Sequence, residues 1–93
     1  MKPYTQHNVD QNTFVRTFDD SIDEQHLKWH VDESNRLVQV VENVDWMIQF
    51  DDCLPVLLQG DVYIPKNMYH RVIKGVGSLI VKITEYDDNT SCK

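Results

Sequence analysis

Three side chains in this sequence have the types and spacing of a metal-binding group. His30 and Asp32 stand two residues apart, and His70 follows later in the chain. Residues i and i+2 of a β-strand point to the same face, so His30 and Asp32 would project together from a strand. Two imidazoles and one carboxylate suit Fe(II), and the same set can hold Mn, Ni or Zn with positions left open for substrate. The pattern therefore indicates a divalent metal site formed by His30, Asp32 and His70.

Four further side chains are candidates for contact with a bound small molecule: Lys28, Arg36, Gln49 and Tyr63. Lys28 would share the face of His30, where it could attract an anionic ligand or pair with Asp32. A ligating imidazole also needs a partner for its second ring nitrogen, and Gln49 or Gln39 could supply one.

Arg36 separates two interpretations of this group. Inside the fold, its guanidinium would pair with Asp32 and oppose a divalent cation. On the surface, it would pair instead with Glu33 or Glu42. His70 could likewise be a core histidine that hydrogen-bonds to the backbone. The residues alone are therefore compatible both with a metal site and with a metal-free fold.

The elements that would position these residues are short strands separated by turn signals. Alternating apolar and β-branched residues predict strands over 13–18, 27–32, 36–42, 45–50, 55–59, 62–64, 69–73 and 78–84. Residues 19–25 are turn-like, with at most one helical turn capped by Asp20 or Ser21. Asn43 is expected to provide left-handed backbone at a turn. The pattern predicts one all-β antiparallel domain over 1–93, with a core at about 13–86 and flexible ends at 1–12 and 87–93.

The composition indicates which classes of partner and which cellular compartment to expect. The net charge is −6 with no cluster of Lys and Arg, so we expect no nucleic-acid partner. Cys53 and Cys92 form no CxxC motif, which favours a reducing compartment. No apolar run follows Lys2 and no stretch is long enough to span a membrane, so we expect a cytoplasmic protein without membrane contact.

The spacing resembles the two motifs of the cupins, G-x5-H-x-H-x3/4-E-x6-G and G-x5-P-x-G-x2-H-x3-N. His30 matches the first histidine, Asp32 stands at the second, Arg36 at the glutamate and Asn43 at the closing glycine. The resemblance covers residues 27–83 and implies a small jelly-roll barrel, a double-stranded β-helix.

The second motif follows the same family pattern with two substitutions. Gly60 and Pro65 are one residue closer than in the family, and His70 keeps its spacing from Pro65. Asn67 stands at the glycine and Lys74 at the final asparagine.

A second resemblance is to the JmjC-type iron/2-oxoglutarate oxygenases, which use H-x-D…H and often carry G-x-K-x-W. Asp45 stands where that pattern has its lysine, and Lys28 or Lys82 would have to replace it. The whole chain also resembles short cupin-like proteins of tailed phages, which implies the host cytoplasm.

The resemblances imply three alternative functions. The first is a cupin that binds a small ligand and holds a divalent metal through His30, Asp32 and His70. Such a protein could catalyse an isomerase or dioxygenase reaction. The second is a metal-free cupin scaffold that acts as a binding or interaction module. The third is a miniature iron/2-oxoglutarate oxygenase. Exposed sheet edges make a homodimer plausible.

Overall fold

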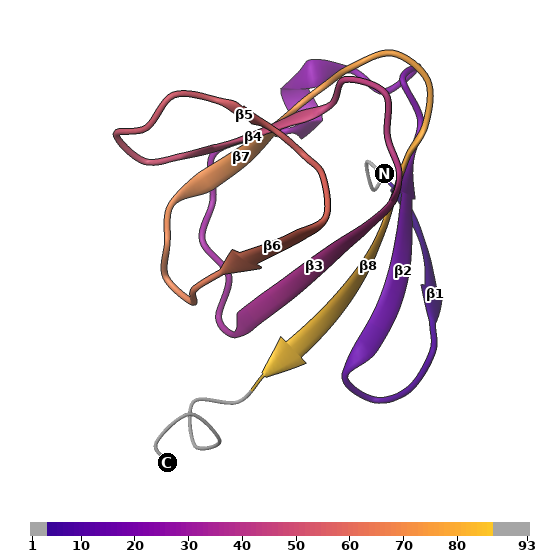
Figure 1. Ribbon diagram of the computed structural model, residues 1–93, viewed down its shortest axis with the longest axis vertical. Coiled ribbons are helices and arrows are strands. Elements are labelled where there is room, and N and C mark those ends of the chain that lie inside the picture. The colour runs from indigo at the N-terminus through magenta and orange to yellow at the C-terminus, as the bar shows by residue number, and fades with distance from the viewer. Residues whose placement is uncertain (1–3, 87–93) are drawn as a thin grey trace.

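The computed structural model describes residues 4–86, and almost all of its regular structure is β-strand (Figure 1). The elements are β1 (Tyr4–Asn8), β2 (Thr13–Phe18), the 3₁₀ helix η1 (Glu24–His26), β3 (Asn35–Glu42), β4 (Met47–Phe50), β5 (Val56–Leu57), β6 (Asp61–Ile64), β7 (His70–Ile73) and β8 (Leu79–Tyr86). Within the described chain, no helix is long and apolar enough to cross a membrane.

The strands form two antiparallel sheets that face each other. The larger sheet has the order β1-β2-β8-β3-β6, and the smaller has the order β5-β4-β7. Strands β3 and β8 pair along most of their length, with a register shift between Val40 and Glu42. Between residues 4 and 86 no strand pairing joins the two sheets, so the expected jelly roll is confirmed as a two-layered antiparallel fold but not as a closed barrel.

The core lies where the inward faces of the two sheets meet. Ile48 on β4 and Trp46 just before β4 are both buried, in agreement with the shared face predicted for them. Leu79, Val81 and Ile83 alternate inward along β8. Trp46 is fully buried, and its indole N–H donates to the Gly77 carbonyl at 3.0 Å. This hydrogen bond removes the cost of burying the polar edge of a large aromatic ring.

The N-terminal segment differs from the prediction that residues 1–12 form a flexible end. Residues 4–8 form β1, which pairs with all but the first residue of β2. Tyr4 packs on Phe18 with ring centroids 5.4 Å apart, and Gln6 accepts a hydrogen bond from Arg16. These cross-strand contacts explain why a polar segment joins the sheet. Residues 1–3 and the predicted C-terminal tail at 87–93 lie outside the described residues.

Residues 27–32 also differ from the prediction, because they form no regular strand. Only His30 makes a β-bridge, with His70. The segment instead passes from η1 into β3 and is held by individual main-chain hydrogen bonds. The helical turn itself is confirmed, but its cap is Asp23, whose carboxylate accepts from the Gln25 N–H, and not Asp20 or Ser21.

Asn43 acts through its side chain and not through left-handed backbone, which the structure gives to Asp52 and Asn67 among non-glycine residues 4–86. Its amide donates to the carbonyls of Trp46 and Leu58 and accepts from the Trp46 N–H. Asn43 therefore ties the start of β4 to the segment after β5.

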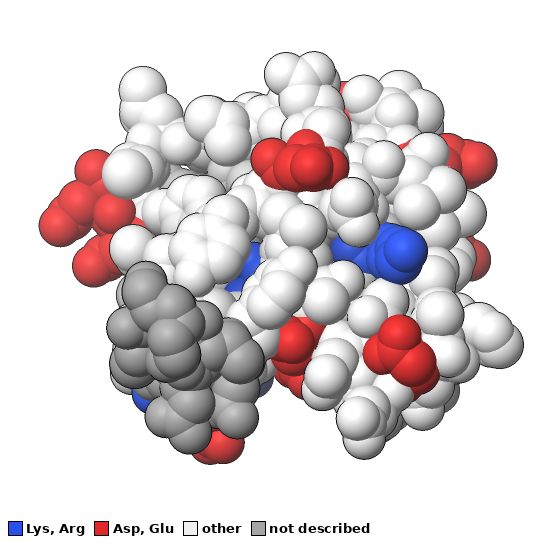
Figure 2. All heavy atoms as spheres, turned by 60° about the horizontal axis from the view of Figure 1, so that its bottom comes forward, with Lys and Arg blue, Asp and Glu red and all other residues white. Residues whose placement is uncertain are grey.

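Acidic side chains dominate the charged surface on the face shown in Figure 2. Asp and Glu form several separate patches there, and Lys and Arg form only small ones. This face carries no continuous basic stripe, in keeping with the net charge of −6.

Candidate metal centre

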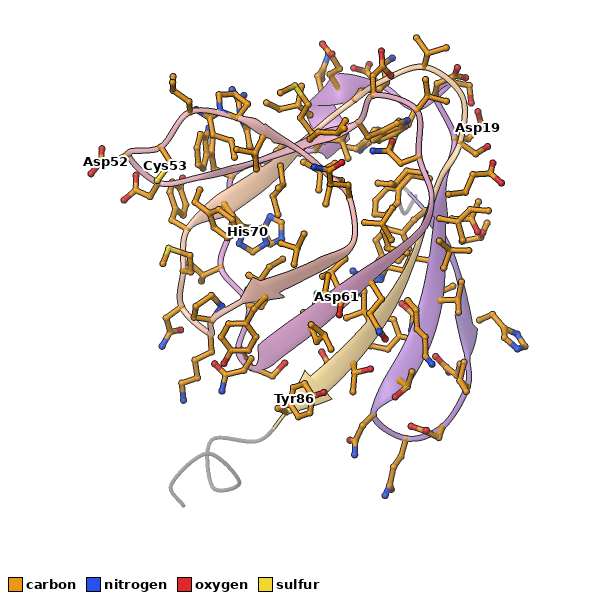
Figure 3. All side chains as sticks on the ribbon, viewed as in Figure 1. Asp19, Asp52, Cys53, Asp61, His70 and Tyr86 are labelled. Atoms are coloured by element: carbon orange, nitrogen blue, oxygen red, sulfur yellow. The ribbon has the colours of Figure 1, made fainter. Side chains whose placement is uncertain are left out.

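A single β-bridge places the two histidines side by side. The His30 N–H donates to the His70 carbonyl at 2.9 Å, and the His70 N–H donates to the His30 carbonyl at 3.0 Å. Residues that exchange both hydrogen bonds lie directly opposite each other, with their side chains on the same face. The imidazole centroids are accordingly 4.4 Å apart. Figure 3 shows His70 pointing between the two sheets, whereas Asp52 and Cys53 lie at the outer end of the β4–β5 hairpin.

Both imidazoles are oriented by main-chain carbonyls two residues earlier. The Nδ1 atom of His30 lies 2.8 Å from the Lys28 carbonyl, and the Nδ1 atom of His70 lies 2.8 Å from the Met68 carbonyl. A carbonyl can only accept, so each Nδ1 carries the proton and donates it. In the neutral rings, each Nε2 therefore keeps a free lone pair. The partner of the second ring nitrogen is thus a main-chain carbonyl in both histidines, and not the side chain of Gln49 or Gln39 as predicted.

Asp32 lies opposite these two nitrogens and is buried. Its Oδ1 is 3.6 Å from the His30 Nε2, and its Oδ2 is 3.4 Å from the His70 Nε2. The Asn67 N–H donates to the Asp32 carbonyl at 2.9 Å and fixes the main chain there. Asn67 can do so in the left-handed conformation, with φ 65°, that a glycine would otherwise provide.

The three side chains fit a divalent cation. One ligand atom from each of them lies within 4.8 Å of the others. The Asp32 Oδ2 is a buried oxygen with no hydrogen-bond partner, which is costly unless something else satisfies it. Burial lowers the pKa of His70 below its ordinary value of 6.5, which keeps the ring in the neutral form that ligates metal. Two lone pairs facing a carboxylate repel it, and a cation between them would turn that repulsion into attraction.

Arg36 lies inside the fold, where it is shared between two acids. Its Nη1 is 3.4 Å from the Asp32 Oδ1, while its Nε and Nη2 donate to the Glu85 Oε2 at 3.2 and 2.9 Å. The pairing with Asp32 agrees with the interior alternative, and the surface partners Glu33 and Glu42 are not used. Arg36 approaches only the Oδ1 of Asp32, and the Oδ2 near His70 has no hydrogen-bond partner in the described chain.

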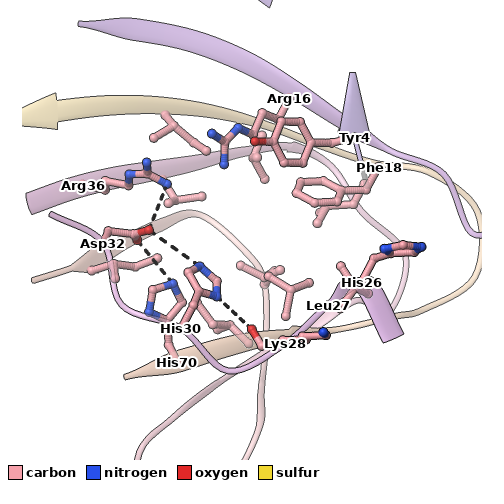
Figure 4. A pocket seen from close by; sticks show the side chains of 18 residues that line it. Tyr4, Arg16, Phe18, His26, Leu27, Lys28, His30, Asp32, Arg36 and His70 are labelled. Atoms are coloured by element: carbon pink, nitrogen blue, oxygen red, sulfur yellow. Dashed lines mark hydrogen bonds and ion pairs between the residues drawn. The ribbon is translucent and has the colours of Figure 1, made fainter. Parts of the chain in front are cut away.

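A cavity of about 440 Å³ adjoins the three side chains (Figure 4). Aliphatic and aromatic residues line most of it, and His30, Asp32 and His70 line one part. Lys28 and Arg36, two of the four residues predicted to contact a ligand, also line the cavity. The volume is within the range of small-molecule sites in proteins.

The other two predicted ligand contacts lie elsewhere. Gln49 accepts from the Arg71 Nε at 3.0 Å and donates to the Cys53 carbonyl at 2.9 Å, and it does not line the cavity. Tyr63 is 54% exposed on β6 and does not line the cavity either.

The position compared with the oxygenase lysine also lies away from the cavity. Asp45 accepts a hydrogen bond from the Val76 N–H at 2.6 Å, and Lys82 is exposed. Of the two lysines considered as replacements, only Lys28 lines the cavity.

Two residues of the site, Glu85 and Arg16, were not predicted, and only Arg16 had a signal in the sequence. Glu85 stands directly opposite Arg36 in the β3–β8 register, which the sequence alone does not reveal. Arg16 lines the cavity from β2, where it alternates with the buried Phe14 and Phe18. The i, i+2 rule applied to residues 14–18 predicts that Arg16 shares their inward face.

Comparisons with known proteins place the fold. No protein-family model matches the sequence, and no curated protein matches it either. Among solved structures, the chain is similar to the DMSP lyase DddQ from Ruegeria pomeroyi, with a TM-score of 0.74 and 9% identity over 92% of this chain and 48% of that one. It is also similar to a cupin-2 domain protein from Shewanella frigidimarina, with a TM-score of 0.60 and 16% identity over 90% of this chain and 79% of that one.

A third similar structure is the Fe(II) form of HppE, with a TM-score of 0.58 and 16% identity over 80% of this chain and 41% of that one. The chain thus spans less than half the length of the lyase and of HppE. The resemblance to tailed-phage proteins stays a prediction. At such low identities the comparisons establish the architecture alone, and that architecture is the cupin-like fold that the two sequence motifs resemble.

Proposed function

We propose that this protein binds a divalent transition metal through His30, Asp32 and His70, and a small organic ligand in the adjoining cavity. The observation that carries the proposal is the buried, unpartnered Asp32 Oδ2 facing two imidazole nitrogens that carry lone pairs. Each of the three groups lacks a partner on the side that faces the other two, and one cation would satisfy all of them.

The remaining residues of the site would hold this group in place and leave room for a ligand. Three protein ligands leave coordination positions free, and a metal there would polarise an oxygen of a bound ligand. Asp32, Arg36 and Glu85 carry one net negative charge, so a divalent ion would leave the group with one net positive charge. HppE, solved with Fe(II) and with Co(II), supports a metal role for this fold.

A metal-free ligand-binding module is the second candidate, because one observation favours it. Arg36 already offers a cation to Asp32 at 3.4 Å. This contact satisfies only the Oδ1 atom, however, and Arg36 is closer to Glu85. The unpartnered Oδ2 is the reason to prefer the metal site.

Metal analysis of protein purified without chelators tests the proposal. We expect one equivalent of Fe, Mn, Ni or Zn in the wild-type protein and in His7→Ala, which removes an exposed histidine on β1. His30→Ala and His70→Ala should lose it. Cobalt(II) added to stripped protein should give a visible absorption band that both variants lack. Protein that binds none of these ions would leave only the metal-free alternative.

A further inference from the structure

Arg16 presents two uncommitted nitrogens to the cavity. Its Nε donates to the Gln6 Oε1 at 3.0 Å, and neither Nη atom has a hydrogen-bond partner among residues 4–86. No carboxylate of the described chain lies within 4.0 Å of it. Arg36 differs in being shared between Asp32 and Glu85. Figure 4 shows both guanidinium groups on the same side of the cavity.

Two aromatic rings hold the Arg16 guanidinium in this position. Its central carbon lies 4.0 Å from the centroid of the Tyr4 ring and 4.8 Å from that of Phe14. Stacking of this kind fixes the plane of the guanidinium before any ligand binds. The terminal pair of Nη atoms is therefore available as a preformed fork for a planar, two-oxygen group.

The partial burial of Arg16 favours a bound anion. Burial lowers the pKa of Arg16 and the positive charge of Arg36 lowers it further, whereas Tyr4, Asp32 and Glu85 raise it, and the guanidinium stays charged at neutral pH. A partly buried cation whose side-chain acceptor is a neutral amide loses hydration without full compensation. An anion on the Nη atoms would offset that loss.

The rest of the cavity indicates what the anion is attached to. Aliphatic side chains of both sheets face the same space, among them Val38, Ile48, Val72 and Val81. We propose that the cavity binds a small aliphatic carboxylate, with its carboxylate on the Arg16 fork and its hydrocarbon body among these side chains. This inference rests on the ligand-binding part of the proposed function and does not require the metal. A phosphate group would carry more charge against apolar walls, which favours the carboxylate.

Binding of hexanoate and of hexanamide to stripped, chelator-free protein tests this inference by titration calorimetry. The two probes have the same size, and only hexanoate carries the charge. Without metal, no carboxylate can bind to a metal ion in place of Arg16. We expect hexanoate to bind at least about 10-fold more tightly than hexanamide, because charge-assisted hydrogen bonds are the stronger kind.

Two variants distinguish a specific effect of the Arg16 side chain from the effect of losing one positive charge. Arg16→Gln should weaken hexanoate binding by about 10- to 100-fold and leave hexanamide binding unchanged. Lys82→Gln removes the same charge from an exposed position on β8 and should bind hexanoate like the wild type. If Arg16→Gln does not fold by circular dichroism, equal binding of the two probes to the wild type would still overturn the inference.

Three results would overturn the inference: equal binding of hexanoate and hexanamide to the wild type, equal effects of Arg16→Gln and Lys82→Gln, or inorganic phosphate binding as tightly as hexanoate. Metal binding with any of these results would leave the metal centre standing and remove only the carboxylate site. Arg16-dependent hexanoate binding by a protein that takes up no metal would support the carboxylate site and remove the metal centre.

Discussion

Replacing His30 by glutamine separates metal binding from folding more cleanly than replacing either other member of the group. The His30 side chain is half exposed, whereas the side chains of His70 and Asp32 are 4% and 8% exposed. The main-chain bridge to His70 does not depend on the side chain at position 30. His30→Gln should therefore leave the stability of metal-free protein nearly unchanged and reduce the stabilisation that metal provides.

The size of this effect follows from linkage between binding and unfolding. A metal present at about 100 times its Kd stabilises the folded state by about 2.7 kcal/mol. The chain has 93 residues, so its unfolding entropy is about 0.2 kcal/mol/K and the melting temperature should rise by about 14 °C. Loss of a ligand should weaken binding by about 100-fold, as much as loss of an orienting partner can. The same metal concentration would then raise the melting temperature by only about 2 °C.

Thermal unfolding followed by circular dichroism measures this difference. Stripped wild-type protein, His30→Gln and the control His7→Gln would each be melted with and without Zn²⁺, Mn²⁺ or Ni²⁺, and with Fe²⁺ in the absence of oxygen. Wild type and His7→Gln should shift alike. A shift of equal size in His30→Gln would refute the proposed ligand set, and no shift in any protein would refute the site itself.

Three further predictions concern stability. Asn43→Ala should lower the free energy of unfolding by about 2–3 kcal/mol in urea titrations, because the side chain makes three hydrogen bonds to the backbone. Gly75→Ala should cost about 1–3 kcal/mol in the same assay, because its Cβ would lie 2.5 Å from the Trp46 nitrogen. Burial lowers the pKa of His70 in the folded protein, so as the pH falls from about 6.5 the unfolded chain binds more protons than the folded one. Metal-free protein should lose stability over that range, and His70→Gln should lose less; equal slopes would contradict this.

The architecture was largely predictable because periodicity survives in the sequence. The alternation of residues 78–84 gave β8, and the shared face of Trp46 and Ile48 gave the buried side of the smaller sheet. Strand β1 was not predicted, because its polar residues 5–8 are exposed and join the sheet through backbone pairing. Residues 27–32 alternate like a strand but find no continuous partner, and periodicity cannot reveal which edges are free to pair.

The clustering of His30, Asp32 and His70 was predicted by residue type and spacing, and the three side chains do come together. Their charged surroundings were not predicted. The partner of Arg36 is Glu85, near the far end of the sequence, and only the β3–β8 register brings them together. The ligand roles given to Gln49 and Tyr63 assumed inward-facing positions that strand geometry gives to their neighbours Ile48 and Ile64.

The carbonyls that orient the two histidines make the group tolerant of change around it. Any residue at positions 28 and 68 supplies the same main-chain oxygen, so the orientation of His30 and His70 does not depend on the side chains there. Lys28 illustrates the consequence, because its carbonyl orients His30 while its residue also lines the cavity. A substitution at this position changes the cavity wall and keeps the main-chain oxygen that orients the imidazole. In the proposed site, ligand preference and metal ligation would therefore be separable within a single residue.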